Sequence, residues 1–200
     1  NNTFTEKAKE YNLDFAGLCT QAAFFDYDHD GDLDCYLLNQ SHHPHSNIVD
    51  TSNRHKYDSL SGDRLYCNNL ADSGRFTDVS AHAGIYQSNL GYGLGLAIAD
   101  INQDGWEDIY IGNDFHENDY YYINNGNGTF TKVTTGPLVN DGGITMSSSW
   151  GDYDNDGDLD VFLANDLGND ALFQNDGSGN FTKMATPPVT SSGGNSFGSQ

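Results

Sequence analysis

The stretch Asp152-Tyr153-Asp154-Asn155-Asp156-Gly157-Asp158-Leu159-Asp160 decides the fold, because the chain contains three copies of its pattern. The other copies are residues 26–34 (DYDHDGDLD) and 100–108 (DINQDGWED). Each copy has an oxygen-bearing side chain at its first, third, fifth and ninth positions and a glycine at its sixth. Such a loop can wrap a hard cation, and Ca²⁺, with about six to eight oxygen ligands in irregular geometry, suits it better than Mg²⁺. The pattern predicts about three calcium-binding loops.

The expected ligands follow from the spacing within each loop. Trp106 occupies the seventh position of the second copy and has no side-chain oxygen, so this position is expected to bind through its backbone carbonyl. The side-chain ligands would be Asp26, Asp28, Asp30 and Asp34; Asp100, Asn102, Asp104 and Asp108; and Asp152, Asp154, Asp156 and Asp160. The seventh positions are Asp32, Trp106 and Asp158.

Two other interpretations of these loops are less favoured. Asp, Asn and Gly also cluster in ordinary turns, but three copies in one register favour a metal. An EF-hand needs a carboxylate at the twelfth position and flanking helices, whereas Leu37, Ile111 and Leu163 stand there and the flanks resemble strands. We expect the ions to be structural, because they would neutralise carboxylates that repel one another. A ligand-binding or catalytic metal is the alternative.

A repeat of about 50 residues surrounds the loops. A Phe-Thr pair recurs at Phe4, Phe76, Phe130 and Phe181, and the first three lie 22, 24 and 22 residues before the next loop. In the middle repeat, strand-like segments cover 97–99, 109–113, 120–123 and 129–133, with an Asn-Gly turn before the last. Four short strands per repeat is the unit of a β-propeller blade.

The predicted fold is therefore all-β: a partial propeller of about three four-stranded antiparallel blades. The repeats are expected at about 18–80, 92–134 and 144–185, with 1–5 ending a preceding blade and 195–200 starting a following one. An arc of about three blades exposes apolar faces and strand edges. The remainder of a propeller or neighbouring subunits are the expected partners there.

The motifs resemble the FG-GAP-like/VCBS repeat family. The resemblance rests on the acidic loop and its following strand, on Leu65-Tyr66-Cys67-Asn68-Asn69, and on Gly74-Arg75-Phe76-Thr77-Asp78-Val79. The long insert of the first repeat is similar to the cartilage-acidic-protein branch and its bacterial relatives. The resemblance implies a calcium-binding propeller of the kind in integrin α-subunit heads, in secreted or surface proteins that adhere or recognise.

Composition excludes some functions. With 29 acidic and 8 basic residues the net charge is −21, which about three Ca²⁺ would bring to −15. Nucleic-acid backbones are poor partners for such a chain, because their binding rests on Lys and Arg. No apolar run approaches the roughly 18 residues of a membrane span. The chain begins with Asn and shows no leader, so a processed product or a piece is expected. We expect an extracellular or cell-surface location, with the periplasm as an alternative.

Cysteine and histidine leave alternatives open. Cys19, Cys35 and Cys67 are an odd set; Cys35 is expected to pack as a small hydrophobe, and a Cys35–Cys67 bridge is the minority option. The insert 40–63 carries several histidines that could bind Zn²⁺ or Cu²⁺, although its Ser, Asn and Pro fit a hydrated loop better. These are His42, His43, His45 and His55.

Function is expected in the loops opposite the acidic ones, because variable loops on a rigid scaffold usually carry recognition. His116 and Glu117 could form an acid/base pair, but a solvated turn is favoured. The run 120–122 (Tyr-Tyr-Tyr) could stack on sugars, but at least two of the three are expected to pack inside the blade. The leading hypothesis is a non-enzymatic recognition or adhesion module that binds protein or glycan. The alternatives are a carbohydrate-active enzyme resembling propeller polysaccharide lyases, and a self-assembling structural subunit.

Overall fold

The computed structural model describes residues 3–43, 51–115, 117–185 and 195–198. Strands dominate, in three four-stranded antiparallel sheets. Sheet 1 contains β1 (Leu18–Phe25), β2 (Asp34–Gln40), β3 (Arg64–Asn69) and β4 (Arg75–Asp78). Sheet 2 contains β5 (Gly93–Ala99), β6 (Asp108–Asn113), β7 (Tyr120–Asn124) and β8 (Phe130–Val133). Sheet 3 contains β9 (Thr145–Gly151), β10 (Asp160–Asn165), β11 (Ala171–Asn175) and β12 (Phe181–Lys183).

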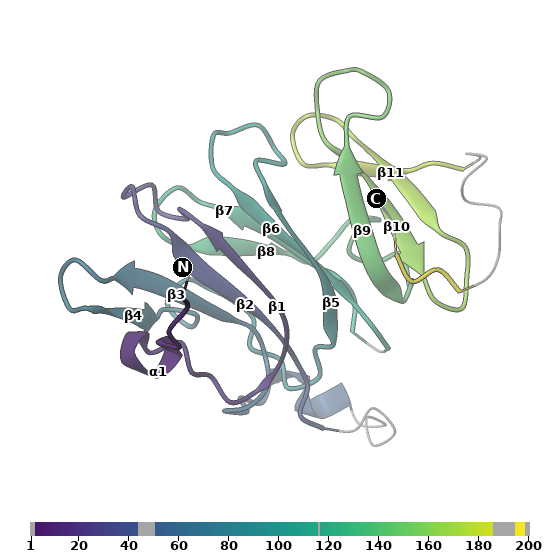
Figure 1. The fold of residues 1–200 in the computed structure, drawn as a ribbon. Helices are drawn as coiled ribbons and strands as arrows, with labels where there is room; N and C mark the ends of the chain where they lie inside the picture. Colours follow the sequence, from purple (N-terminus) through teal and green to yellow (C-terminus); the bar gives the residue numbers. More distant parts are fainter. Residues whose placement is uncertain (1–2, 44–50, 116, 186–194, 199–200) are drawn as a thin grey trace.

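Each sheet is a meander whose strands pair in chain order. The sheets stand side by side, with β5 between β1 and β9 (Figure 1). The first strand of each sheet therefore lies innermost and the fourth outermost, as in a propeller blade. The predicted all-β, partial propeller-like fold is confirmed.

Apolar side chains fill the spaces between the sheets because the strands alternate in period two. Along β6, Ile109 and Ile111 belong to the core between sheets 1 and 2, and Tyr110 belongs to the core between sheets 2 and 3. All of β6 is buried, because sheet 2 has a neighbour on each face. Stacking of neighbouring sheets thus supplies the core that no single meander could form.

A glycine lets the inner strands approach closely. A Cβ added to Gly93 of β5 would lie only 2.3 Å from Cδ1 of Leu38 in β2. A larger residue would push sheets 1 and 2 apart near the innermost strand. This explains why a segment rich in glycine forms a strand at this place, where a side chain would be excluded.

The segment before sheet 1 contains the short helix α1 (Ala8–Tyr11). Tyr11 and Leu13 pack against Cys35, Tyr66 and Phe76 on the outer face of sheet 1. Residues 3–5 form no strand and are exposed, so their assignment to a preceding blade stays a prediction. The contact of Tyr11 and Leu13 with the outer face of sheet 1 was not predicted from the sequence.

Residues 195–198 lie beside sheet 3. Ser196 N donates to Asn165 O at 3.1 Å, and Ser196 Oγ donates to Asp170 Oδ2 at 2.9 Å. Thr145, at the start of β9, makes the equivalent contact to Asp119 Oδ2 of sheet 2 at 2.7 Å. The contact agrees with the predicted start of a following blade, which stays a prediction.

The cysteines are unpaired. Cys35 is buried in the cluster on the outer face of sheet 1, whereas Cys67 packs against the core on the other face. A bridge between them is excluded because successive residues of a strand point to opposite faces, and Cys35 pairs in register with Tyr66. Burial raises the pKa of Cys35 to about 11, as expected for a packed, unreactive thiol.

Candidate metal and ligand sites

The three acidic loops connect the first and second strands of each sheet and share one backbone conformation. The glycine at the sixth position has a φ of +94° at Gly31, +92° at Gly105 and +97° at Gly157, which is the left-handed region that only glycine enters freely. The first aspartate closes the turn. In the first loop, Asp26 accepts hydrogen bonds from the backbone nitrogens of Asp30 and Gly31, both at 3.0 Å. The same pair of bonds recurs at Asp100 and at Asp152.

The ninth residue of each loop is buried and holds the loop to the third strand. Asp108 accepts from Ile101 N at 3.2 Å and from Asn124 N at 2.8 Å. The same bonds join Asp34 to Tyr27 and Asn68, and Asp160 to Tyr153 and Asn175. Burial raises the pKa of Asp34 to about 7 and that of Asp108 to about 6, because the charged form is desolvated.

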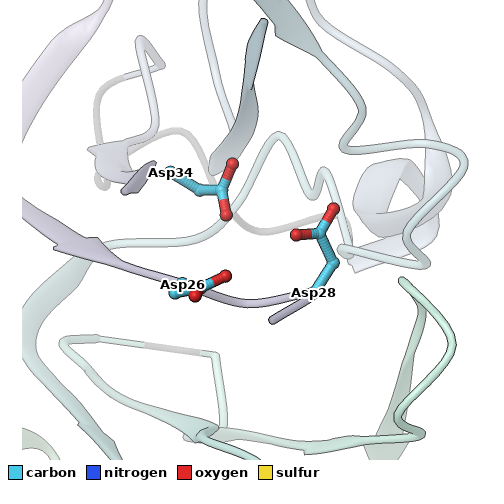
Figure 2. A group of neighbouring side chains, drawn as sticks. All are labelled: Asp26, Asp28 and Asp34. Carbon is cyan, nitrogen blue, oxygen red and sulfur yellow. The ribbon is translucent and has the colours of Figure 1, made fainter. Parts of the chain in front are cut away.

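Carboxylates gather in two of the loops. The oxygens of Asp26, Asp28 and Asp34 lie within 4.8 Å of one another, and Figure 2 shows the three side chains converging on one space. Asp152, Asp154 and Asp156 form the equivalent group in the third loop, although Asp160 is not part of it. In the second loop the amide of Asn102 donates to Asp104 Oδ2 at 2.9 Å instead. These two groups are the metal-type clusters among the described residues.

Some carboxylate oxygens of the first and third loops have no hydrogen-bond partner among the described residues. Asp28 Oδ1, Asp32 Oδ1 and Asp158 Oδ1 are buried and accept no hydrogen bond from the described residues. Burial, followed by repulsion from neighbouring carboxylates, raises the pKa of Asp28 and raises that of Asp158 to about 6. A divalent cation would coordinate the unpaired oxygens and neutralise the repulsion. The residues present therefore fit Ca²⁺ in the first and third loops.

Neighbouring loops also contact one another. The His29 ring stacks on Trp106 with 4.0 Å between ring centroids, and His29 Nε2 lies 3.1 Å from Glu107 Oε2. Trp106, included as a seventh-position ligand through its carbonyl, uses its side chain to join two loops. The third strand adds a further link, since Asn124 Nδ2 donates to Tyr27 O of the preceding loop at 2.9 Å and Asn175 Nδ2 donates to Ile101 O at 2.9 Å.

A second series of buried aspartates lies at the other end of the sheets. Asp119 precedes β7, and it accepts from Asn113 N at 2.7 Å and from Tyr110 Oη at 2.5 Å. Asp63 and Asp170 accept equivalent bonds from Asn39 N and Asn165 N. Sequence reasoning missed this series, although an Asn ending the second strand and an Asp preceding the third recur in every repeat. Burial raises the pKa of Asp63 and of Asp119 to about 7.

A cavity of about 390 Å³ opens at this second end, between η2 (Thr51–His55), the loop after β6 and the outermost strand β8. Arg54 Nε donates to the buried Glu117 at 2.5 Å, and Tyr120 Oη donates to the same carboxylate at 3.0 Å. Lys132 Nζ lies 4.1 Å from the ring centroid of Tyr120 and 4.3 Å from that of Tyr86. Cations, a carboxylate and aromatic rings therefore meet in one cavity.

Tyr120, Tyr121 and Tyr122 are buried, as expected for blade packing. Glu117 pairs with Arg54, and His116 lies outside the described residues.

The histidines of the insert do not form a metal site in the part of the chain that is described. His43 pairs with Asp58 at 2.9 Å, and His55 Nδ1 lies 3.1 Å from Tyr86 Oη. No described histidine joins a group of three ligand side chains. His45 lies outside the described residues.

Meander sheets joined by equivalent acidic loops define a repeat protein of the propeller type. The FG-GAP-like repeat profile matches residues 100–163 and 152–199, which together cover half of the chain. The chain belongs to the FG-GAP-like repeat family.

One similar solved structure is a lectin from Agrocybe aegerita, described for its specific recognition of non-reducing terminal N-acetylglucosamine. It is 21% identical with a TM-score of 0.43, and the match covers 81% of this chain and 36% of the lectin chain. This chain therefore spans about a third of the lectin's length. No curated protein matches the chain in sequence. No helix among the described residues has the length and apolar character to cross a bilayer.

Proposed function

We propose that this chain is a non-enzymatic, calcium-stabilised recognition or adhesion module that binds a glycan or protein ligand outside the cell. The main observation behind the proposal is that the two ends of the sheets differ in structure. Three loops of one conformation occupy one end, and a cavity lined by unlike side chains occupies the other. A repeated loop suits a structural role, whereas variable loops on a rigid scaffold suit recognition.

The proposed cofactor is about three Ca²⁺, one in each acidic loop. Unpaired oxygens at Asp28, Asp32 and Asp158 support the ions of the first and third loops, and the equivalent backbone conformation of the second loop supports the remaining one. In each loop the bound ion would neutralise carboxylates and hold the connection between the first two strands. The ninth aspartate already attaches the loop to the third strand through its hydrogen bonds to backbone nitrogens. A bound ion would therefore stabilise a loop conformation that forms without it.

The proposed location is extracellular or at the cell surface, with the periplasm as the alternative. Membership in the FG-GAP-like repeat family supports this location. Calcium sites of extracellular modules typically bind with Kd values of about 10⁻⁴–10⁻³ M, which external calcium can fill.

The proposed partners of the outer faces are further blades or neighbouring subunits. The second residue of each loop supports this, because Tyr27 and Ile101 are 5% and 0% exposed between sheets whereas the equivalent Tyr153 is 46% exposed. Light scattering of the chain in Ca²⁺ tests self-assembly. A concentration-independent monomer would rule out neighbouring copies as the partner and leave further blades.

A glycan array, with protein arrays in parallel, tests the recognition function. We expect binding in Ca²⁺ that falls after chelation, because the loops hold the sheets that carry the ligand-binding end. No ligand on either array, with the protein folded and calcium bound, would contradict the proposal.

A carbohydrate-active enzyme remains the second candidate, because Lys132, His55 and Glu117 meet in the cavity. Polysaccharide-lyase chemistry needs a base and a cation near the sugar carboxylate. This cavity, however, adjoins the outermost strand β8 and not the innermost strands. Product formation from acidic polysaccharides, monitored by ultraviolet absorbance, would establish the enzyme in place of the binding module.

A further inference from the structure

Two lysines at equivalent places provide an internal comparison. Lys132 pairs in register with Tyr122, and Lys183 pairs with Phe173, at the same position of sheets 2 and 3. Each lysine borders a cavity of about 390 Å³ beside an Asn-Asp pair that precedes the third strand. Equivalent cavities therefore lie beside sheets 2 and 3. The surroundings of the two ammonium groups can be compared directly.

The two ammonium groups differ in their counter-charges. Lys183 Nζ lies 3.5 Å from Asp141 Oδ2, on the segment that precedes sheet 3. The segment that precedes sheet 2 instead presents Tyr86, whose ring centroid lies 4.3 Å from Lys132 Nζ. Within the described residues, no carboxylate or other hydrogen-bond acceptor reaches Lys132. Burial lowers the pKa of Lys132, and the attraction of the Glu117 carboxylate, which lines the same cavity, opposes this shift.

A second cation faces the same cavity. Arg54 uses its Nε to bind Glu117, and its side chain is 36% exposed. Its two terminal nitrogens have no acceptor among the described residues. Arg54 comes from η2, in the long connection between β2 and β3 of sheet 1, whereas the equivalent connection between β6 and β7 of sheet 2 is only residues 114–119. The cavity at Lys132 therefore has donors for an anion, whereas Lys183 is already paired with Asp141.

The acidic groups of the cavity are already satisfied. Glu117 accepts from Arg54, Tyr120 and Ser88. Asp119 accepts from Asn113, Tyr110 and Thr145. Because these bonds use the carboxylate oxygens, the groups left for a ligand are the Lys132 ammonium, the Arg54 terminal nitrogens and the side of the Tyr86 ring.

We propose that the cavity between Arg54 and Lys132 binds a carboxylate-bearing sugar, such as a uronic acid residue. Arg54 and Lys132 would hold the carboxylate by charge-assisted hydrogen bonds. Tyr86, which also lines the cavity, would contact the apolar face of the sugar ring. The volume is at the lower end of the usual range for ligand cavities, which suits one sugar ring. The inference rests on the proposed recognition function and names its ligand class and site.

Titration of the full chain with D-glucuronate and with D-glucose in Ca²⁺ tests the inference. The two probes differ in the carboxylate, so glucuronate is expected to bind at least about tenfold more tightly, which equals about 1.4 kcal/mol. Equal affinity, or affinity for glucose alone, would overturn it. An Asp-rich peptide provides a further probe, and its binding in place of glucuronate would also overturn the assignment to a sugar.

Variants locate the binding at this cavity. Lys132→Met keeps the stem on the two tyrosine rings and removes the charge, and Arg54→Gln removes the other cation; each is expected to weaken glucuronate binding at least about tenfold. Lys132→Arg should retain most of the affinity. Lys183→Met is the matched control and should leave it unchanged, since that lysine pairs with Asp141. Equal losses for Lys132→Met and Lys183→Met would show a general effect on charge or folding and would overturn the site.

The failure of this inference is distinguishable from the failure of the proposed function. Array binding to neutral glycans or to a protein, unchanged by Lys132→Met, would retain the recognition function and reject the acidic-sugar site. Absence of every ligand from the arrays would reject the recognition function and, with glucuronate also unbound, this inference as well.

Discussion

The two ends of the sheets use aspartate differently. At the acidic-loop end, one buried aspartate per loop binds backbone nitrogens while further carboxylates stand without partners. At the opposite end, Asp119 and its equivalents satisfy their oxygens with protein donors alone. A cation at the acidic-loop end would balance these carboxylates, whereas Asp119 and its equivalents accept hydrogen bonds from the protein itself. The acidic loops recur in every sheet, whereas the insert and the cavity between Arg54 and Lys132 lie at the opposite end.

Calcium should have the largest effect. One site saturated at about 100 times its Kd contributes about 2.7 kcal/mol, which for a domain of this size raises the Tm by roughly 5–10 °C. With about three sites, we expect chelation to lower the Tm by at least about 10 °C in a thermal melt followed by circular dichroism. A Tm that is the same in Ca²⁺ and in chelator would contradict the proposal that the acidic-loop end binds stabilising calcium ions.

Replacing one buried aspartate at each end sharpens the comparison within sheet 2. Asp108→Ala removes the acceptor of two backbone N–H groups, and Asp119→Ala removes that of one N–H and two hydroxyls. In chelator each should destabilise the fold by about 2–5 kcal/mol in urea unfolding, because buried donors lose their acceptors. Only Asp108→Ala should also weaken calcium binding to the second loop in calorimetry. Equal calcium responses of the two variants would contradict the assignment.

The pH dependence should reverse with calcium. Burial raises the pKa of Asp63 and of Asp119 to about 7, above an unfolded value of about 3.9. Their protonated form is therefore favoured by folding: the stability they contribute is complete below about pH 4 and is lost as the pH rises through 7.

In chelator we expect the free energy of unfolding to fall by roughly 1–4 kcal/mol between pH 5 and 8. The additional stability given by Ca²⁺ should rise over the same range, because the ligands must lose their protons to bind. Urea unfolding at the two pH values, with and without calcium, measures both slopes. A calcium contribution that is constant with pH would argue against carboxylate ligands.

The smallest effect is expected at the contact between the first two loops. His29→Asn gives the first loop the residue that Asn155 supplies in the third, at a position with positive φ in both. The change removes the stacking on Trp106 and the exposed pair with Glu107, at a cost of about 0.5–1 kcal/mol. Asp58→Asn, which weakens the His43 pair at the other end, is the matched control. A loss beyond about 2 kcal/mol would show that this contact supports the loop end more than its exposure indicates.

The strands and loops were predictable because their signals are local and repeated. Alternation such as Ile109-Tyr110-Ile111 predicts a strand buried on both faces, and three acidic loops in one register fix where each sheet begins. The boundaries agree with the structure to within a few residues.

The cavity was not predictable, because it depends on contacts across the chain. Arg54 and Glu117 are 63 residues apart, and only the stacking of sheets 1 and 2 brings them together. The helix α1 was missed for the same reason, since its four residues form against the outer face of sheet 1 and carry no periodic pattern. The aspartates before each third strand carried a signal, but an Asp at a strand start also fits an ordinary turn.

The links made by Asn124 and Asn175 have a consequence for how such a chain can lengthen. Each asparagine reaches back to a carbonyl of the previous loop, while the second residue of that loop, Tyr27 or Ile101, inserts forward. Sheet 2 thus contains both contact residues: Asn124 binds the loop of the sheet before it, and Ile101 packs against the sheet after it. A tandem gene duplication would therefore add a sheet that can make the same contacts with its neighbours, with no compensating substitution elsewhere.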